Sequence, residues 1–277
     1  MLNAVALGTF DGLHKGHLSV LSIPDSFKKT ALIFTIPPRQ VKSGEINLLL
    51  TTEEKIKKFE DLGFEVKTLN FNEVEHLSPE EFLQFIKNEL DPSLISCGFN
   101  YRFGFKGSGD GETLKRFCKE NNIELRLCDP VCEGGEPISS SRIRNCLENG
   151  RIDEANRLLG YDFYFTAPVI KGDGRGKTLG FPTINQAYPK SLTPLKFGVY
   201  KTKITIEDKI YKGITNVGNR PTFPLDYIIS ETFIKDFSGD LYGKEIKIAF
   251  TEFLREERKF SSKEDLKIQV LSDIEKI

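Results

Sequence analysis

The hydrophobic pattern of this chain changes character once, near residue 160. Before that point, short apolar runs alternate with amphipathic stretches, which is typical of β–α–β units and a parallel sheet. After it, short β-rich runs are separated by Gly, Pro, Asn and Asp, which predicts an antiparallel sheet or small barrel. A length of 277 residues suits two domains. We therefore predict an α/β domain over 1–160 and an all-β domain over 161–277, with the boundary in or just after two helices at 140–150 and 152–160.

The first domain is predicted to contain five strands with helices between them. The expected strands are Ala4–Leu7, Thr30–Thr35, Glu65–Leu69, Leu94–Cys97 and Leu125–Cys128. One helix should cover Thr52–Leu62 and end at Gly63. Another should begin at Pro79, because Ser78 and Glu81 have the spacing of a capping box.

The second domain should close with a helix after its strands. The expected strands are Phe163–Ile170, Gly198–Ile206, Ile210–Val217, Ile228–Ile234 and Glu245–Phe250. Ser261 or Ser262 can cap the closing helix. Leu266, Val270 and Ile274 recur every four residues, and we expect them to form its buried stripe.

The composition limits the kinds of molecule that this protein is expected to bind. With 39 Lys+Arg against 40 Asp+Glu, the net charge of −1 supplies no field for coating a nucleic acid, although small phosphorylated ligands stay open. No stretch approaches the roughly 18 apolar residues of a membrane span, and the start lacks a signal-peptide pattern. We expect a cytoplasmic protein that binds neither nucleic acid nor membranes. The 5 cysteines include no CxxC pair, so neither a disulfide framework nor a zinc site is expected.

The segment Gly8–His17 follows the first predicted strand and opens the first helix. Gly8 and Gly12 permit close backbone approach, and the free N–H groups at a helix start favour an anion. His14 and His17 share one helical face, so both imidazoles could donate to an α-phosphate during nucleotidyl transfer. The alternative interpretation is a glycine turn with two exposed histidines.

The segment GTFDGLHKGH resembles the HxGH signature of the α/β-phosphodiesterase nucleotidylyltransferases. In its longer form it is similar to the adenylyltransferase half of the bacterial bifunctional riboflavin kinase/FMN adenylyltransferases. ISSSRIR at 138–144 is similar to that family's ISSTxIR motif, and GFNYRFG at 98–104 resembles its G-x-N/D-F-R-F-G loop. Many members have TFDPHP after the second strand, where this chain has FTIPPR at 34–39. The flavin side of this pocket therefore departs from the family pattern.

The resemblance implies roles for individual residues of the first domain. His14, His17 and Arg144 would be catalytic, with Ser141 helping to stabilise the developing charge. The residues that would bind ATP in this domain are Gly8, Phe10, Asp11, Gly16, Asn100, Arg102, Ser140 and Ser141.

A glycine-rich, basic segment at 172–185 has the chemistry of a phosphate clamp. Its backbone N–H groups could wrap a triphosphate, and the oxygens of Thr183 and Asn185 are hard ligands suited to Mg²⁺. A plain glycine-rich hairpin is the alternative. The segment resembles the riboflavin kinase motif that ends LGFPTAN, with Lys177 replacing the usual arginine and Ile184 the alanine. By that resemblance, ATP would be bound by Gly172, Gly174, Lys177, Thr183 and Asn185, and the metal by Thr183 and Asn185.

Two further segments, 216–222 and 230–243, also match the kinase half of the family. By resemblance Glu231 is the general base, which would accept the proton of the riboflavin 5′-hydroxyl as that oxygen attacks the γ-phosphate. Without the family, Glu231 is one of 40 acidic residues and a solvated strand position. The residues that would bind the flavin are Phe181, Asn216, Arg220 and Arg255.

The order of the two motif sets leads to one interpretation. We expect a Rossmann-like nucleotidyltransferase domain followed by a six-stranded barrel kinase that together convert riboflavin to FMN and FMN to FAD, using ATP and Mg²⁺. The only partners expected are these small-molecule substrates. One alternative keeps the kinase but gives the first domain another nucleotide transfer. Others are a non-catalytic flavin- or nucleotide-binding regulator and an RNA-binding protein, since HxGH also occurs in class I aminoacyl-tRNA synthetases.

Overall fold

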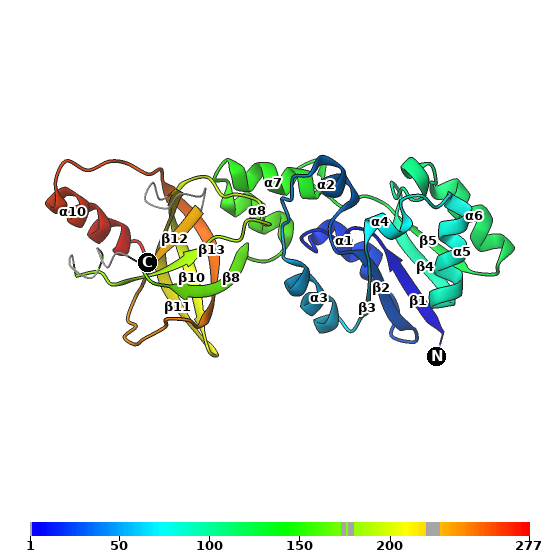
Figure 1. Ribbon diagram of the computed structural model, residues 1–277, viewed down its shortest axis with the longest axis horizontal. Coiled ribbons are helices and arrows are strands. Elements are labelled where there is room, and N and C mark those ends of the chain that lie inside the picture. The colour runs from blue at the N-terminus through cyan, green and yellow to red at the C-terminus, as the bar shows by residue number, and fades with distance from the viewer. Residues whose placement is uncertain (1, 173–175, 177–179, 220–227) are drawn as a thin grey trace. The chain divides into compact units, whose positions relative to one another are not determined.

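The protein forms two compact units, Met1–Ser140 and Ser141–Ile277. The computed structural model describes residues 2–172, 176, 180–219 and 228–277. The first unit contains a parallel sheet and the second a closed barrel (Figure 1). The predicted fold class is thereby confirmed, whereas the predicted boundary at residue 160 stays a prediction.

Five parallel strands form the sheet of the first unit, in the order β3-β2-β1-β4-β5. Their bounds are β1 Asn3–Leu7, β2 Lys28–Phe34, β3 Glu65–Leu69, β4 Pro92–Gly98 and β5 Glu124–Cys128. These bounds confirm all five predicted strands to within two residues. The chain reverses its direction of winding between β1 and β4, and open α/β sheets bind ligands at the carboxyl ends of the strands at such a point. The glycine-containing segment that follows β1 starts at that edge.

Helices and short elements fill the connections of the first unit. They are α1 Lys15–Leu21, α2 Pro38–Ser43, α3 Thr52–Asp61, α4 Phe71–Val74, α5 Pro79–Leu90, the 3₁₀ turn Phe105–Gly107, α6 Gly111–Glu120, β6 Cys132–Glu133 and β7 Glu136–Pro137. The predicted capping box at α5 is confirmed. The Ser78 hydroxyl accepts from the Glu81 N–H at 3.2 Å, and the Glu81 carboxylate accepts from the Ser78 N–H at 2.7 Å.

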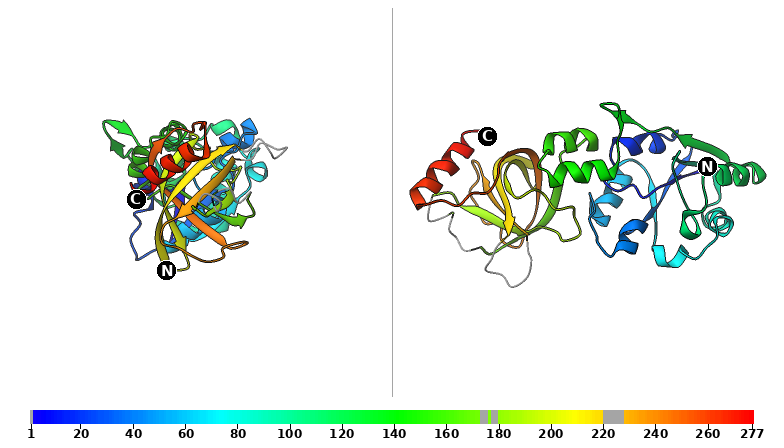
Figure 2. Two further views of the ribbon diagram at one scale, coloured as in Figure 1. Left: turned by 90° about the vertical axis from the view of Figure 1, so that its left-hand side faces the viewer. Right: turned by 90° about the horizontal axis from the view of Figure 1, so that it is seen from above.

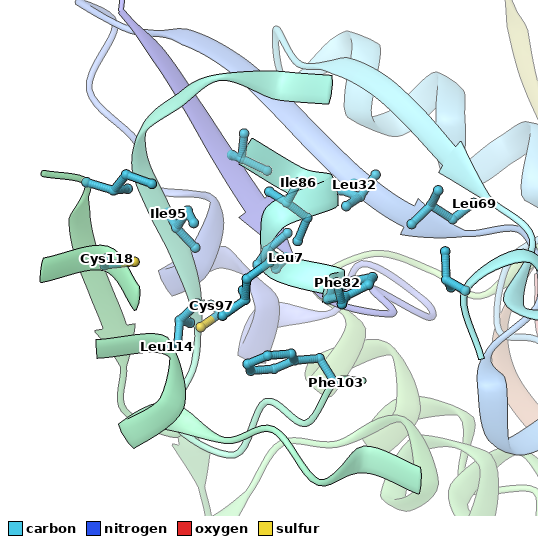
Figure 3. Packing of buried hydrophobic residues seen from close by; sticks show 14 residues of the cluster. Leu7, Leu32, Leu69, Phe82, Ile86, Ile95, Cys97, Phe103, Leu114 and Cys118 are labelled. Carbon is cyan, nitrogen blue, oxygen red and sulfur yellow. The ribbon is translucent and has the colours of Figure 1, made fainter. Parts of the chain in front are cut away.

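One hydrophobic cluster of this unit lies between the sheet and helices α5 and α6. Leu7 of β1 and Ile95 of β4 gather with Phe82 of α5 and Leu114 of α6 (Figure 3). Each of these side chains is at most 2% exposed. Burying one large apolar side chain contributes about 1.5–3 kcal/mol, so this cluster anchors the strand that leads into the glycine segment.

Six antiparallel strands close the second unit into a barrel, in the order β10-β11-β12-β9-β8-β13. Figure 2 shows the barrel from two further sides. Their bounds are β8 Tyr164–Ile170, β9 Thr183–Ala187, β10 Gly198–Ile206, β11 Lys209–Asn219, β12 Ile228–Ile234 and β13 Glu245–Arg255. The strand β9 is absent from the individually predicted strands because its sequence, TINQA, is short and polar. Gln186 explains how it fits, since its buried amide donates to the backbone carbonyls of Ala167 and Ile246.

Three helices belong mainly to the second unit: α7 Ser140–Glu148, α8 Ile152–Leu159 and α10 Lys263–Ile274. The predicted Ser262 cap of α10 is confirmed, because its hydroxyl accepts from the Asp265 N–H at 3.1 Å. The predicted buried stripe of α10 is wrong. Leu266, Val270 and Ile274 are only half-buried, and Asp273 is the one buried residue of this fully described helix. A buried ion pair, rather than an apolar stripe, attaches α10 to the barrel.

Across the described ranges, none of the helices combines the length and the apolar character that a bilayer crossing would require.

Candidate active sites

The segment between β1 and α1 makes a tight turn in an unusual backbone conformation. Phe10 has φ 47°, Gly12 has φ 83° and Leu13 has φ 40°, so three of four consecutive residues adopt the left-handed region. That region is costly for a residue with a Cβ atom and persists only where packing enforces it. Phe10 is 1% exposed and Leu13 is buried, so the core holds the turn in place.

The two histidines of the segment lie face to face. The ring centroids of His14 and His17 are 3.6 Å apart with an interplanar angle of 19°. Phe10 packs its ring edge-on against His17 at a centroid distance of 5.3 Å. His14 is 3% exposed, so the alternative of two exposed histidines at a helix start is wrong.

Burial gives His17 its charge state. The pKa of His17 is lowered well below its usual value of 6.5, first by burial and then by the charges of His14 and Lys55. A neutral imidazole offers one N–H donor and one acceptor nitrogen. His17 can therefore donate to a phosphate oxygen at neutral pH without carrying a positive charge itself.

Two glycines make room for aromatic rings in this segment. A Cβ atom on Gly16 would lie 2.9 Å from the His14 ring and from the Ile138 carbonyl oxygen. A Cβ atom on Gly8 would lie 2.9 Å from the Phe10 ring. Both glycines, which were predicted to contact ATP, thus allow the aromatic rings of the turn to fold back on the backbone.

Asp11 points into the protein. Its carboxylate is 2% exposed and accepts from the Leu49 N–H at 2.9 Å. The Ser140 hydroxyl donates to the Asp11 carbonyl at 3.0 Å, which connects the ISSSRIR segment to the glycine turn. The predicted contacts of Asp11 and Ser140 with ATP stay predictions, and their described contacts hold the turn in position.

Lys55 of α3 is a residue near this turn that the sequence did not single out. It is 2% exposed, and its ammonium donates to the Phe34 carbonyl at 2.9 Å. Burial lowers the pKa of Lys55, and the charge of Asp11 acts in the opposite direction. The available sequence signal is its position four residues before Phe59, which places both on the buried face of α3.

The segment after β4 has both inward-packed and exposed side chains. Tyr101 stacks on Phe103 at 5.6 Å, and burial raises the pKa of Tyr101 far above its usual value. Phe99 and Asn100 are exposed, and Arg102 pairs with Asp110 at 3.4 Å on the surface. Tyr101 and Phe103 therefore pack inward, while Asn100 and Arg102 lie on the surface at the sheet edge where a nucleotide would bind.

Ser141 and Arg144 lie on α7, within the second unit. Ser141 is exposed and Arg144 half-buried, and the neighbouring Arg142 pairs with Glu154 of α8 at 3.1 Å. The predicted catalytic roles of Ser141 and Arg144 stay predictions.

The barrel brings several of the predicted kinase residues into one row. Glu231 of β12 pairs directly with Asn185 of β9 on one side and with Asn216 of β11 on the other. Directly paired residues of antiparallel strands have Cβ atoms about 4.5–5.5 Å apart. The alternate residues Ser230 and Thr232 are fully buried in the barrel interior, so the row lies on the outer face.

Two described glycines of the glycine-rich segment, Gly172 and Gly176, lie close to β9. A Cβ atom on Gly172 would overlap the Asn185 carboxamide, and one on Gly176 would lie 3.1 Å from the Thr183 hydroxyl. The ring of Phe181 meets that of Phe233, two residues after Glu231 on β12, edge-on at 6.3 Å. Three predicted site residues lie outside the described ranges, namely Gly174, Lys177 and Arg220.

Arg255, at the end of β13, is held by a buried carboxylate. Its Nε and Nη2 atoms donate to Asp273 of α10 at 2.9 and 2.7 Å, and Asp273 is 1% exposed. The Asn216 carboxamide donates to the Glu257 carboxylate at 2.9 Å. Two residues predicted to bind flavin, Arg255 and Asn216, therefore lie on elements that the segment after β13 and helix α10 hold in place.

Comparisons with known proteins identify a family for each part of the chain. The chain matches the family model for FAD synthetase over residues 2–142 and that for riboflavin kinase over residues 159–277. It is similar to the bifunctional riboflavin kinase/FMN adenylyltransferase of Bacillus subtilis, with 34% identity over 98% of this chain and 90% of the relative. The protein of the same name from Listeria monocytogenes is 32% identical over 97% of this chain and 89% of the relative.

A solved structure shares the fold. It is described as a macrolide-efflux protein from Streptococcus pneumoniae and superposes with a TM-score of 0.90 at 28% identity, over 99% of this chain and 93% of the other. The similarity covers both the sheet and the barrel.

Proposed function

This chain belongs to the bifunctional riboflavin kinase/FMN adenylyltransferase family, and from that membership we propose how its residues carry the two reactions. The second domain phosphorylates riboflavin with ATP to give FMN. The first domain adenylylates FMN with ATP to give FAD and releases pyrophosphate. FMN is therefore the product of one domain and the substrate of the other.

In the first domain we assign the adenylyl transfer to the turn after β1. A phosphate oxygen of FMN forms a bond to the α-phosphorus of ATP while the bond from that phosphorus to pyrophosphate breaks. His14 and His17 donate to the α-phosphate as negative charge develops on it. The stacked imidazole pair, held by Phe10 and by the absence of a side chain at Gly16, is the observation that carries this assignment. Positioning and charge stabilisation suffice, so no covalent enzyme intermediate is required.

In the second domain we assign the phosphorylation to the row on the outer face of the barrel. Glu231 accepts the proton of the riboflavin 5′-hydroxyl as that oxygen attacks the γ-phosphorus, and ADP leaves. Asn185 is paired directly with Glu231 and lies next to the glycine-rich segment, which would carry the triphosphate. The general base and the phosphate site are thereby neighbours.

The donor set of the second site suits Mg²⁺. Thr183 and Asn185 lie on the same face of β9 and offer a hydroxyl and a carboxamide oxygen, hard ligands of the kind this ion prefers. When bound with ATP, Mg²⁺ would neutralise charge on the phosphate oxygens. Within the described residues no group of three or more His, Cys, Asp or Glu forms a metal cluster, so substrate phosphates would complete the coordination.

For the flavin of the second domain we assign Phe181, Asn216 and Arg255 as contacts. Phe181 contacts Phe233, two residues after Glu231 on β12, and Asn216 pairs directly with Glu231. The guanidinium of Arg255 could stack on the flavin ring. A cytoplasmic location and the restriction of partners to small molecules remain part of the proposal.

One experiment tests the pair of activities. Purified protein is incubated with riboflavin, ATP and Mg²⁺, and FMN and FAD are separated by chromatography; a second reaction starts from FMN. We expect FMN and then FAD in the first reaction and FAD in the second. FMN formation without FAD from either substrate would instead support a first domain that performs another nucleotide transfer, as the departure at 36–39 allows.

A further inference from the structure

Lys55 is a buried cation at the base of the adenylyl-transfer turn. Its side chain is 2% exposed, although lysine is almost never fully buried without a partner. Its ammonium donates to the Phe34 carbonyl at 2.9 Å, at the end of β2. One such hydrogen bond uses one of the three donors of an ammonium group and does not offset the loss of hydration.

The countercharge comes from Asp11, inside the turn. The Asp11 carboxylate is also 2% exposed, interacts electrostatically with Lys55 and accepts from the Leu49 N–H. Lys55 is thus bonded to the end of β2 and Asp11 to the segment before α3, while the two opposite charges act on each other in one buried region. Removing either charge would leave the other buried without compensation.

The same helix also supports the turn through an aromatic contact. Phe59, one helical turn after Lys55, meets the ring of Phe10 edge-on at 5.3 Å. Phe10 in turn packs against His17. Helix α3 therefore holds the left-handed residues of the turn from two points, one apolar and one charged.

We propose that Lys55 is a positioning residue for adenylyl transfer: paired with Asp11, it holds the turn that places His14 and His17. The inference rests on the proposed adenylyltransferase function. Lys55 acts through the turn and needs no contact with substrate. Its positive charge also faces His17, together with that of His14, and favours the neutral imidazole.

The primary test uses Lys55→Met, which keeps the length of the side chain and removes its charge. We expect FAD formation from FMN to fall by about 100-fold, the scale of a misplacement near 1 Å, mainly in kcat. Riboflavin phosphorylation by the same chain should stay within about two-fold, since its site lies in the other unit. Lys57→Met, an exposed lysine on the same helix, is the matched control and should leave both activities unchanged.

A second readout does not depend on turnover. The chain has 3 histidines, so their NMR resonances can be assigned by substitution. In Lys55→Met the pKa of His17 should rise, because one of the charges that lowers it is gone. A simple packing defect would reduce activity without this change. If wild-type protein made no FAD at all, the proposed function would fail, whereas the titration of His17 would still judge the role of Lys55.

Two more variants cover the case in which the first domain of Lys55→Met does not fold. Lys55→Arg keeps the charge and should retain more FAD formation than Lys55→Met. Asp11→Asn combined with Lys55→Met removes both charges and should fold, with a loss of FAD formation no larger than that of Asp11→Asn alone, because the pair acts as a unit. FAD formation within two-fold of wild type in Lys55→Met, or losses that multiply in the double variant, would overturn the proposal.

Discussion

At the scale of single residues, His14 and His17 can stack because one of the two residues between them, Gly16, has no side chain. A Cβ atom on Gly16 would lie within 2.9 Å of the His14 ring, so the ring occupies space that any other residue would need. The motif is contiguous in sequence, and for that reason its chemistry was predictable before its geometry was known.

His17→Ala should abolish FAD formation while FMN formation stays within a few-fold. In the proposed mechanism this histidine serves only the phosphate site of the first domain, and loss of one preorganised donor costs about 100- to 1,000-fold in rate. Both products are measured by chromatography after incubation with riboflavin and ATP. His76→Ala, at an exposed histidine of the same domain, is the control. Equal loss of FMN and FAD in a folded variant would contradict the assignment.

The lowered pKa of His17 also predicts how stability depends on pH. In the unfolded chain this histidine takes up a proton below about pH 6.5, whereas the folded protein keeps it neutral to a lower pH. The unfolded state therefore binds more protons, and the free energy of unfolding of the first domain falls as pH decreases below about 6.5. Hydrogen exchange of the β1 amides between pH 7 and 5.5 measures this slope. His17→Gln should have a shallower slope, and an unchanged slope would contradict the prediction.

Glu231→Gln should impair the reaction that His17→Ala leaves intact, namely the phosphorylation of riboflavin. The carboxamide keeps the shape of the side chain but cannot accept the 5′-hydroxyl proton, so riboflavin phosphorylation should fall by roughly 100- to 10,000-fold. FMN supplied directly should still be adenylylated. Glu245→Gln, at an exposed glutamate where β13 begins, is the matched control. Normal kinase turnover in Glu231→Gln would remove this residue from the mechanism.

Residues that act through long-range contacts were not predictable. Lys55 and Asp11 are far apart in sequence, and the charge of each suggests a solvated position until the fold buries both. For Glu231, a role was expected from the sequence but its neighbouring residue was not. Its role came from the family resemblance, while its direct pairing with Asn185 required the register of β9 and β12.

At the scale of elements, prediction succeeded where an apolar period continued for several residues. The strand Gly198–Ile206 and the helix starting at Pro79 have such periods and were predicted with their observed starts. Strand β9 has a polar sequence, which fits because the Gln186 carboxamide donates to carbonyls of β8 and β13 inside the barrel. Helix α10 has a four-residue apolar spacing, yet Asp273 is the residue it buries.

Asp273→Asn should therefore weaken flavin binding indirectly, because Asp273 of helix α10 holds Arg255. Arg255 would lose its buried ionic partner, and breaking such a pair costs about 3–5 kcal/mol when one charge is left uncompensated. Because Arg255 stays 20% exposed and can regain some hydration, the lower end of that range is expected. We expect the KM for riboflavin to rise by about 10-fold or more, with FAD formation from FMN unchanged.

The control for this variant is Glu275→Gln, at an exposed carboxylate of the same helix end. It should leave the KM for riboflavin unchanged. If Asp273→Asn lowered the melting temperature without changing that KM, Asp273 would hold the helix but not the flavin-binding arginine.

At the scale of the whole molecule, we expect the segment 141–160 to contribute to both reactions, through different helices. Helix α8 buries an apolar face that includes Leu158, and Asn156 donates to the Phe250 carbonyl and accepts from the Phe163 N–H, both at 2.8 Å. These contacts join α8 to the barrel. Helix α7 instead carries Ser141 and Arg144, which the family motif relates to adenylyl transfer.

This double use predicts how the protein can be divided. Fragments 1–160 and 161–277 should each fold, because each has its own core and its size is well above the roughly 40 residues below which staples are needed. Fragment 141–277 should be more stable than 161–277, since only the longer one keeps the contacts of Asn156. Fragments 141–277 and 161–277 should both phosphorylate riboflavin, because each contains Thr183, Asn185 and Glu231.

The complementary pair of fragments gives the sharper comparison. Fragment 1–160 should adenylylate FMN, whereas 1–140 should fold but lose that activity by about 100-fold or more, because it lacks Ser141 and Arg144. Circular dichroism establishes folding, and chromatography of FMN and FAD measures each activity. Equal adenylylation by 1–140 and 1–160 would remove α7 from the first site. A kinase fragment that is folded but active only after the N-terminal piece is added would mean that its site needs residues from both domains.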